Sequence, residues 1–116
     1  MTKRQRFLGW VLLAGLLASC TSSSSGHYFG TYSAAEQLYS KGKYEAAAKK
    51  YHQYLNEKPQ GNMAAIAEYY MAKCYKKIGK TEEARTHFQQ VMRDYPKTSW
   101  ADFSKKQIED LASSSE

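Results

Sequence analysis

Residues 72–96 read AKCYKKIGKTEEARTHFQQVMRDYP. The same landmarks occur 37 residues earlier, in residues 35–59, which read AEQLYSKGKYEAAAKKYHQYLNEKP. The matching positions are Ala35 and Ala72, Gly42 and Gly79, Ala47 and Ala84, Tyr51 and Phe88, Pro59 and Pro96, and then Ala64 and Ala101 at the start of a third partial copy. Small residues let helices cross closely, a glycine ends a helix in the left-handed conformation, and a proline stops the next helix. The repeat therefore predicts stacked helical hairpins in an all-α fold.

The spacing of apolar residues predicts where the helices lie. Ser33 and Glu36 have the spacing of a capping box, which places the start of the first helix at Ser33 and its end at Gly42. Apolar residues at three- and four-residue steps predict further helices over about 44–57 and 62–78, and two more that begin at Thr81 and Ser99. The predicted domain covers 33–112 as two helical hairpins and a C-terminal capping helix, followed by a disordered tail at 113–116.

This pattern resembles the tetratricopeptide repeat, a helical hairpin unit of about 34 residues that stacks into a superhelix. The family's small, aromatic, glycine and proline positions fall in the second unit at Ala72, Tyr75, Gly79, Ala84, Phe88 and Pro96. In the first unit they fall at Ala35, Leu38, Gly42, Ala47, Tyr51 and Pro59. The chain departs from the family at Glu68, where the family has tryptophan, and at Tyr54 and Val91, where it has alanine. The resemblance implies a module for protein–protein interaction.

The first twenty residues have the layout of an export signal. Lys3, Arg4 and Arg6 precede the uncharged stretch 7–18, which is shorter than the roughly 20 residues of a membrane-spanning helix. Leu17-Ala18-Ser19-Cys20 resembles the lipobox of bacterial lipoproteins. The resemblance implies removal of residues 1–19 as a signal peptide and attachment of fatty acyl chains such as palmitate to Cys20, which together anchor a protein stably. The alternative is a plain secretion signal with an incidental cysteine.

The segment after the lipobox predicts a tether. Residues 20–32 contain a serine tract and few aliphatic side chains, so we expect the lipidated cysteine to be followed by a flexible linker. Tyr28, Phe29 and Tyr32 are unusual in a linker, and the alternative is that they pack on the first helix. Thr21 follows the cysteine where the inner-membrane retention signal would have aspartate, which favours the outer membrane.

The net charge changes once the signal peptide is removed. The chain has 17 basic and 11 acidic residues, a formal net charge of +6. Loss of residues 1–19 leaves 14 basic and 11 acidic residues, a net charge of +3 that is ordinary for a small domain. No zinc-finger or RNA-recognition pattern is present, so we expect no nucleic-acid partner.

The lipobox and the repeat together resemble the tetratricopeptide lipoprotein subunit of the outer-membrane β-barrel assembly machinery. The repeats are also similar to those of the Tol-Pal coordinator protein. These resemblances imply a protein anchored by lipid in the bacterial outer membrane, with its domain facing the periplasm and scaffolding a cell-envelope assembly through envelope protein partners. The alternatives are a binding protein for an anionic envelope polymer and a small pilotin-type lipoprotein of a secretin or pilus system.

The resemblance also implies a groove, since the first helix of each tetratricopeptide unit lines the inner surface of the superhelix. The candidate partner-binding residues are Glu36, Tyr39, Ile66, Tyr69, Lys73, Lys76, Lys77 and Lys106. The same helix faces also carry Ser40, Phe103 and Asp110. Tyrosines among lysines suit an acidic peptide or a C-terminal carboxylate, because the rings offer contact area and the ammonium groups offer charge. The alternative is that these lysines form an ordinary solvated helix face.

The remaining reactive residue types do not form a recognisable site. Cys74 lies on an apolar helix face and is predicted to be a core residue. His27, His52 and His87 lie in separate segments with no carboxylate at ligand or relay spacing, so we predict no metal, no cofactor and no enzymatic activity.

Overall fold

The computed structural model describes the backbone of residues 25–57 and 60–116, and side chains from Gly30 onward. The predicted signal peptide, Cys20 and Pro59 lie outside the described residues. Within the described part the chain forms five helices and no strand: α1 (Ser25–Ser40), α2 (Tyr44–Glu57), α3 (Asn62–Lys77), α4 (Thr81–Asp94) and α5 (Ser99–Ser113). None of these helices is long and apolar enough to cross a membrane.

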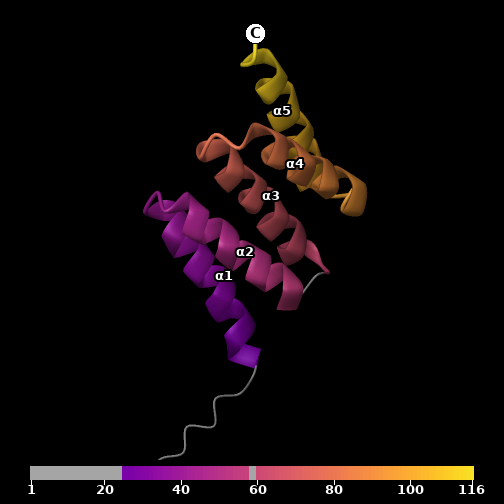
Figure 1. Ribbon diagram of the computed structural model, residues 1–116. Coiled ribbons are helices and arrows are strands. Elements are labelled where there is room, and N and C mark those ends of the chain that lie inside the picture. The colour runs from indigo at the N-terminus through magenta and orange to yellow at the C-terminus, as the bar shows by residue number, and fades with distance from the viewer. Residues whose placement is uncertain (1–24, 58–59) are drawn as a thin grey trace, which may run out of the picture.

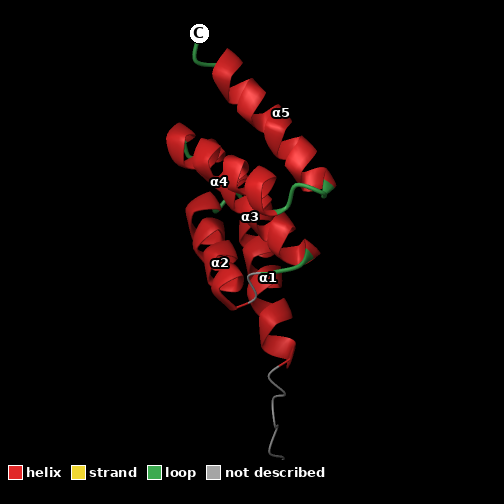
Figure 2. Cartoon of the chain, turned by 90° about the vertical axis from the view of Figure 1, so that its right-hand side faces the viewer, coloured by secondary structure: helices red, strands yellow, loops and turns green. Residues whose placement is uncertain are grey.

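The helices stack in chain order, as Figure 1 shows. α1 and α2 form one hairpin and α3 and α4 a second, and each helix packs against the next one along the chain. α5 packs on α4 and also contacts α3, which leaves its other side exposed at the C-terminal end of the stack (Figure 2). The predicted all-α fold of two hairpins and a capping helix is confirmed.

The start of the first helix differs from the prediction. α1 begins at Ser25, eight residues before Ser33, so Ser33 lies inside the helix and the capping box is wrong. Residues 25–32, predicted as the end of the tether, are therefore helical. The reason is burial: Tyr32 is 9% exposed, and its ring lies 5.8 Å from the Tyr51 ring and 5.4 Å from the Tyr54 ring of α2. Tertiary packing of this kind outweighs the weak helix propensity of the two glycines and the threonine in the segment.

Of the three aromatic residues at this end, only Tyr32 has a described side chain, and it packs on the domain. The side chains of Tyr28 and Phe29 lie outside the described set. At the other end of the chain, residues 113–116 were predicted as a disordered tail. Ser113 is instead the last residue of α5, and the hydroxyls of Ser114 and Ser115 donate hydrogen bonds to carbonyl oxygens of its final turn.

Both hairpin turns close in the same way. Gly42 and Gly79 have φ angles of 75° and 82°, in the left-handed region that favours glycine. After each glycine, the next residue donates its N–H to a carbonyl five residues earlier, from Lys43 to Leu38 and from Lys80 to Tyr75, both at 2.9 Å. These bonds are those of a Schellman motif, and they confirm the predicted glycine caps.

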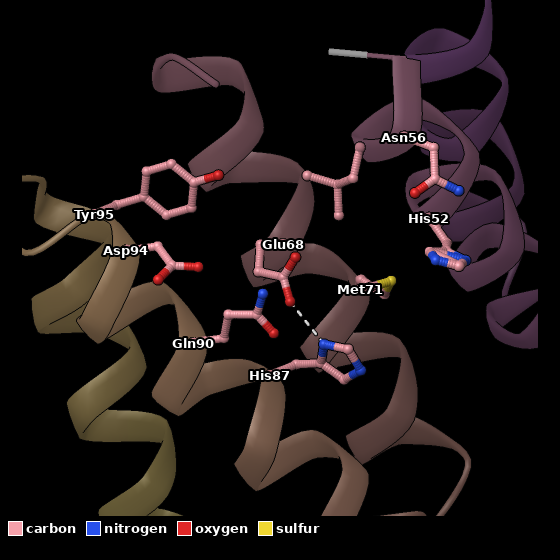
Figure 3. Close-up of a pocket in the computed structure, with 9 residues that line it drawn as sticks. His52, Asn56, Glu68, Met71, His87, Gln90, Asp94 and Tyr95 are labelled. Atoms are coloured by element: carbon pink, nitrogen blue, oxygen red, sulfur yellow. Dashed lines mark hydrogen bonds and ion pairs between the residues drawn. The ribbon is translucent and has the colours of Figure 1, made fainter. Parts of the chain in front are cut away.

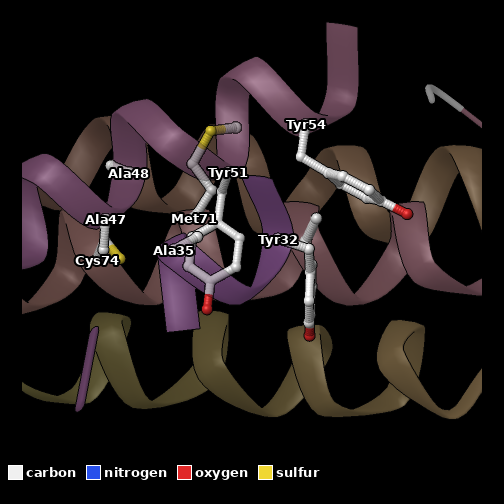
Figure 4. Close-up of a cluster of buried hydrophobic side chains, with 9 residues drawn as sticks. Tyr32, Ala35, Ala47, Ala48, Tyr51, Tyr54, Met71 and Cys74 are labelled. Carbon is white, nitrogen blue, oxygen red and sulfur yellow. The ribbon is translucent and has the colours of Figure 1, made fainter. Parts of the chain in front are cut away.

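Residues at equivalent positions of the two predicted repeats are buried to nearly the same extent. Ala35, Ala72, Ala47 and Ala84 all have no exposed surface, and Tyr51 and Phe88 are 1% and 0% exposed. The first core cluster, drawn in Figure 4, joins α1, α2 and α3. The second joins α3, α4 and α5 around Phe88 and Val91. Cys74 has no exposed surface in the first cluster, and burial raises the pKa of its thiol to about 12, which confirms it as an unreactive core residue.

Tyrosines fill much of this core, and their burial changes their acidity. Burial raises the pKa of Tyr39 to about 12, and it raises those of Tyr32 and Tyr51 further. Tyr32 also donates a hydrogen bond to Glu36, and the nearby carboxylate disfavours the tyrosinate. The folded protein therefore holds these hydroxyls neutral at pH values where an unfolded chain has begun to lose their protons.

Replacing Gly30 tests whether α1 begins where the structure places it. A Cβ at Gly30 meets no atom within 4 Å, so Gly30→Ala should raise the free energy of unfolding by about 0.5–1 kcal/mol if the position is helical. Gly42→Ala is the matched control, because its φ of 75° should make alanine destabilising by about 1–2 kcal/mol. Urea unfolding followed by circular dichroism measures both. A Gly30→Ala variant of unchanged stability would indicate a tether rather than a helix at this position.

Alkaline titration tests the tyrosine core. In the folded protein the pKa values of the buried tyrosines lie above the ordinary 10.0. The contribution of these neutral hydroxyls to the free energy of unfolding is therefore complete below pH 10 and is lost as the pH rises from about 10 to 12. At about pH 11 the folded protein should show less tyrosinate absorbance than the urea-unfolded protein, and its free energy of unfolding should be lower than at neutral pH. Tyr51→Phe should reduce the difference in tyrosinate absorbance between the folded and unfolded protein by the contribution of one tyrosine. Superimposable titration curves for the folded and unfolded protein would contradict the predicted burial.

Candidate partner-binding surface

One surface gathers tyrosine rings and lysine ammonium groups from both hairpins. We call it the tyrosine–lysine face. It consists of Tyr39, Tyr44, Tyr69, Tyr70, Lys73, Lys76 and Lys77. Four of its five α3 residues, at 69, 73, 76 and 77, recur at three- and four-residue steps, which is the spacing of one helix face. Tyr39 comes from the last turn of α1 and Tyr44 from the start of α2.

Lys73 lies at the centre of the face. Its Nζ lies 5.5 Å from the ring centroid of Tyr70, 5.8 Å from that of Tyr69 and 5.9 Å from that of Tyr39, all within the range of a cation–π interaction. The side chain is half-buried. Its burial lowers the pKa of Lys73, and the charges of Lys77 and Lys76 lower it further. The ammonium group is therefore partly removed from water and repelled by its neighbours.

The two other lysines connect the face to α2 and α5. Lys77 Nζ lies 6.0 Å from the ring centroid of Tyr44. Lys76 Nζ donates a hydrogen bond of 2.8 Å to Oε1 of Gln107 on α5. Gln107 also hydrogen-bonds to Tyr69, whose pKa is raised by burial and lowered in part by this bond. The face is thus fixed by contacts that span three helices.

Within the described part of the chain, the lysines of the face form no ion pair. Among the described residues the ion pairs join Arg85 to Glu82, His87 to Glu68, and Arg93 to Asp94. None of them includes Lys73, Lys76 or Lys77. Lys73 and Lys76 are half-buried and Lys77 is exposed. Clustered positive charge without a carboxylate partner creates a local field that attracts an anionic group.

The structure brings five of the eight predicted groove residues together on this face: Tyr39, Tyr69, Lys73, Lys76 and Lys77. Tyr69 is only 7% exposed, with its ring 5.2 Å from that of Trp100, so it supports the surface from beneath. Of the other three, Ile66 packs against the first core cluster, Glu36 accepts the hydrogen bond from Tyr32, and Lys106 is exposed on α5.

Sequence reasoning missed three members of this arrangement. Tyr44, Tyr70 and Gln107 are not among the candidate residues that the sequence indicated. The three-residue step from Tyr70 to Lys73 is a signal that could have identified Tyr70. Nothing in the local sequence indicates that Gln107 meets Lys76, since 31 residues separate them.

A second feature is a carboxylate partner for His87, although the sequence shows no carboxylate at ligand or relay spacing from this residue. His87 Nδ1 lies 2.6 Å from Oε1 of Glu68, and the His87 ring stacks on Tyr75 at 5.1 Å between centroids. The pair lines a pocket of about 350 Å³ between α2, α3 and α4, shown in Figure 3. Among the described residues no group of three His, Cys, Asp or Glu side chains could hold a metal ion.

Comparisons with known proteins identify one segment of this structure. The family model of the tetratricopeptide repeat matches residues 67–98, which cover most of α3, all of α4 and the turn that follows. A search of curated proteins and a search of solved structures each found no match. The second hairpin of this all-α protein is therefore a tetratricopeptide repeat, a motif that typically builds non-enzymatic scaffolds for binding protein partners.

Proposed function

We propose that this protein is a lipid-anchored scaffold of the bacterial cell envelope, and that its tyrosine–lysine face binds an acidic segment or a C-terminal carboxylate of an envelope protein. The observation that carries the proposal is the environment of Lys73. Its ammonium group lies within 6 Å of three tyrosine ring centroids and forms no ion pair within the described part of the chain.

A carboxylate of a bound partner would supply the negative charge with which the lysines of this face form an ion pair. It would pair with Lys73 and Lys77 and so offset the desolvation of Lys73 and the repulsion of Lys73 by the Lys77 charge. The tyrosine rings add rigid contact area that loses little conformational entropy on binding. Charge on the rim steers the encounter, and the rings around Lys73 provide the packed centre that dominates binding energy in protein interfaces.

Only a short stretch of sequence separates the proposed lipid anchor from the first helix. Cys20 precedes the first residue of α1 by five residues, and five extended residues span at most about 17 Å. A helical start at Ser25 therefore leaves a shorter linker than a tether reaching to residue 32. Acyl chains on Cys20 would hold the repeats near the periplasmic side of the outer membrane, where they can meet membrane-bound partners.

The combination of lipobox and tetratricopeptide repeat supports a place in an envelope assembly such as β-barrel insertion or the Tol-Pal system. Within such an assembly the protein would act by holding a partner, because a carboxylate-binding face offers recognition rather than bond chemistry. This role requires no cofactor.

Charge reversal on the face tests the proposed binding. The double variant Lys73→Glu, Lys77→Glu should reduce the amount of co-purifying envelope protein at least about tenfold, since a missing partner of a buried charge pair costs roughly 2–5 kcal/mol. Lys49→Glu, Lys97→Glu is the matched control, because both lysines are exposed and lie outside the face. Affinity purification of the native lipidated protein followed by quantitative mass spectrometry measures the loss.

Three outcomes would contradict the proposal. Equal recovery of partners by both double variants would exclude the face as the binding surface. Retention on isolated peptidoglycan without any protein partner would favour the anionic-polymer alternative. A secretin recovered equally well by both variants would favour a pilotin that uses another surface.

Replacing Cys20 tests the anchor separately. Cys20→Ala should abolish incorporation of labelled palmitate and shift the protein from the detergent phase to the aqueous phase, because two or three acyl chains supply the membrane affinity. Cys74→Ala is the control, since Cys74 is buried and should leave labelling unchanged. Intact-mass analysis should show a diacylglyceryl adduct at position 20 only in chains that retain Cys20. Equal labelling of the Cys20→Ala variant would exclude lipidation at this site.

A further inference from the structure

The pocket between α2, α3 and α4 lies on the other side of α3 from the tyrosine–lysine face. Glu68 and Lys73 are five residues apart, which places them roughly 140° apart around the helix. The pocket, drawn in Figure 3, is lined by His52, Leu55, Asn56, Glu68, Met71, His87, Gln90, Asp94 and Tyr95. It is therefore a separate site, formed where the two hairpins meet.

The lining of this pocket is acidic. It includes two carboxylates, Glu68 and Asp94, and no lysine or arginine. Glu68 is 5% exposed, and its one ion pair within the described residues is with His87, whose charge depends on protonation. Asp94 pairs with Arg93 at 3.5 Å, but the two side chains are 43% and 69% exposed, so water screens this pair. A buried carboxylate that lacks a permanent cation favours a positively charged ligand.

The shape and polarity of the pocket narrow the choice of cation. Leu55 and Met71 form an apolar part that can receive the methylene groups of a long side chain. Asn56 and Gln90 also line the pocket and add carboxamide oxygens as neutral acceptors; Gln90 lies near Glu68, and Asn56 lies next to His52 (Figure 3). A volume of about 350 Å³ is at the lower end for ligand pockets and suits a single side chain. A guanidinium group, with five donors in a planar fork, matches several acceptors better than an ammonium group does.

We infer that this pocket binds an arginine side chain of a partner protein, with the guanidinium on Glu68 and the methylene groups on Leu55 and Met71. The scaffold then has two recognition sites of opposite charge preference on opposite sides of α3. This inference does not depend on the function proposed for the tyrosine–lysine face, since the residues that carry it are different.

Methyl NMR of the lipidated full chain in nanodiscs tests the inference. With ¹³C-methyl methionine, Met71 reports on the pocket, and Met63 and Met92 serve as internal references. Addition of N-acetyl-arginine methylamide should move the Met71 signal along a saturating curve with a dissociation constant of about 1–10 mM. N-acetyl-citrulline methylamide, which has a similar shape without the charge, should leave the signal in place.

Variants separate binding from folding. Glu68→Gln should weaken arginine binding at least about tenfold, since the hydrogen bond from the guanidinium to a charged carboxylate is lost. Glu83→Gln, at an exposed position on α4 outside the pocket, is the matched control and should not change it. Asn56 is exposed, so Asn56→Leu should preserve the fold and weaken binding several-fold even if Glu68→Gln fails to fold. The Lys73→Glu, Lys77→Glu variant should bind the probe normally.

Two results would overturn the inference. A Met71 signal that does not move with the arginine probe excludes an arginine site in this pocket. Equal shifts with the arginine and citrulline probes would show that the pocket does not select for positive charge.

Discussion

The close crossing of helices at alanine residues is the constraint on which the rest of this structure depends. Ala35, Ala47, Ala72 and Ala84 have no exposed surface, and each repeats 37 residues away in the chain. A larger side chain at any of these crossings would separate two helices, because packed interiors have few voids to absorb extra volume. Since the alanines bring the backbones together, large side chains collect beside the crossings. This explains why tyrosines form both the first core cluster and the surface above it.

The central position of α3 follows from this packing and explains why both candidate sites share it. α3 contacts α2, α4 and α5, so side chains on nearly every side of it meet another helix. On one side Lys73 is held among tyrosine rings, and on the other Glu68 is held by His87. Each charged group is positioned by neighbours from other helices, which gives it a fixed geometry before any partner arrives.

The sequence allowed prediction of those features that depend on local chemistry. Gly42, Gly79 and Pro96 mark the ends of helices through their own backbone preferences, and the four-residue step from Lys73 to Lys77 places both on one face. The early start of α1 could not be predicted in this way, because Tyr32 stabilises it through contacts with α2 and the local residues favour helix only weakly. The Glu68–His87 pair was also missed, since 19 residues separate its members and only the antiparallel hairpin brings them together.

The energetics of these two charged groups argue for binding rather than stability as their role. A stack of two hairpins and one helix buries a small core, so its net stability is modest. Lys73 loses hydration without gaining an ion pair within the described residues, and Glu68 is buried beside a partner that is charged only when protonated. Well-packed apolar side chains at such positions are often neutral or more stable than buried charges. Lys73 and Glu68 therefore weaken a small core. Their presence is best explained by ligands with which the two charged groups would pair.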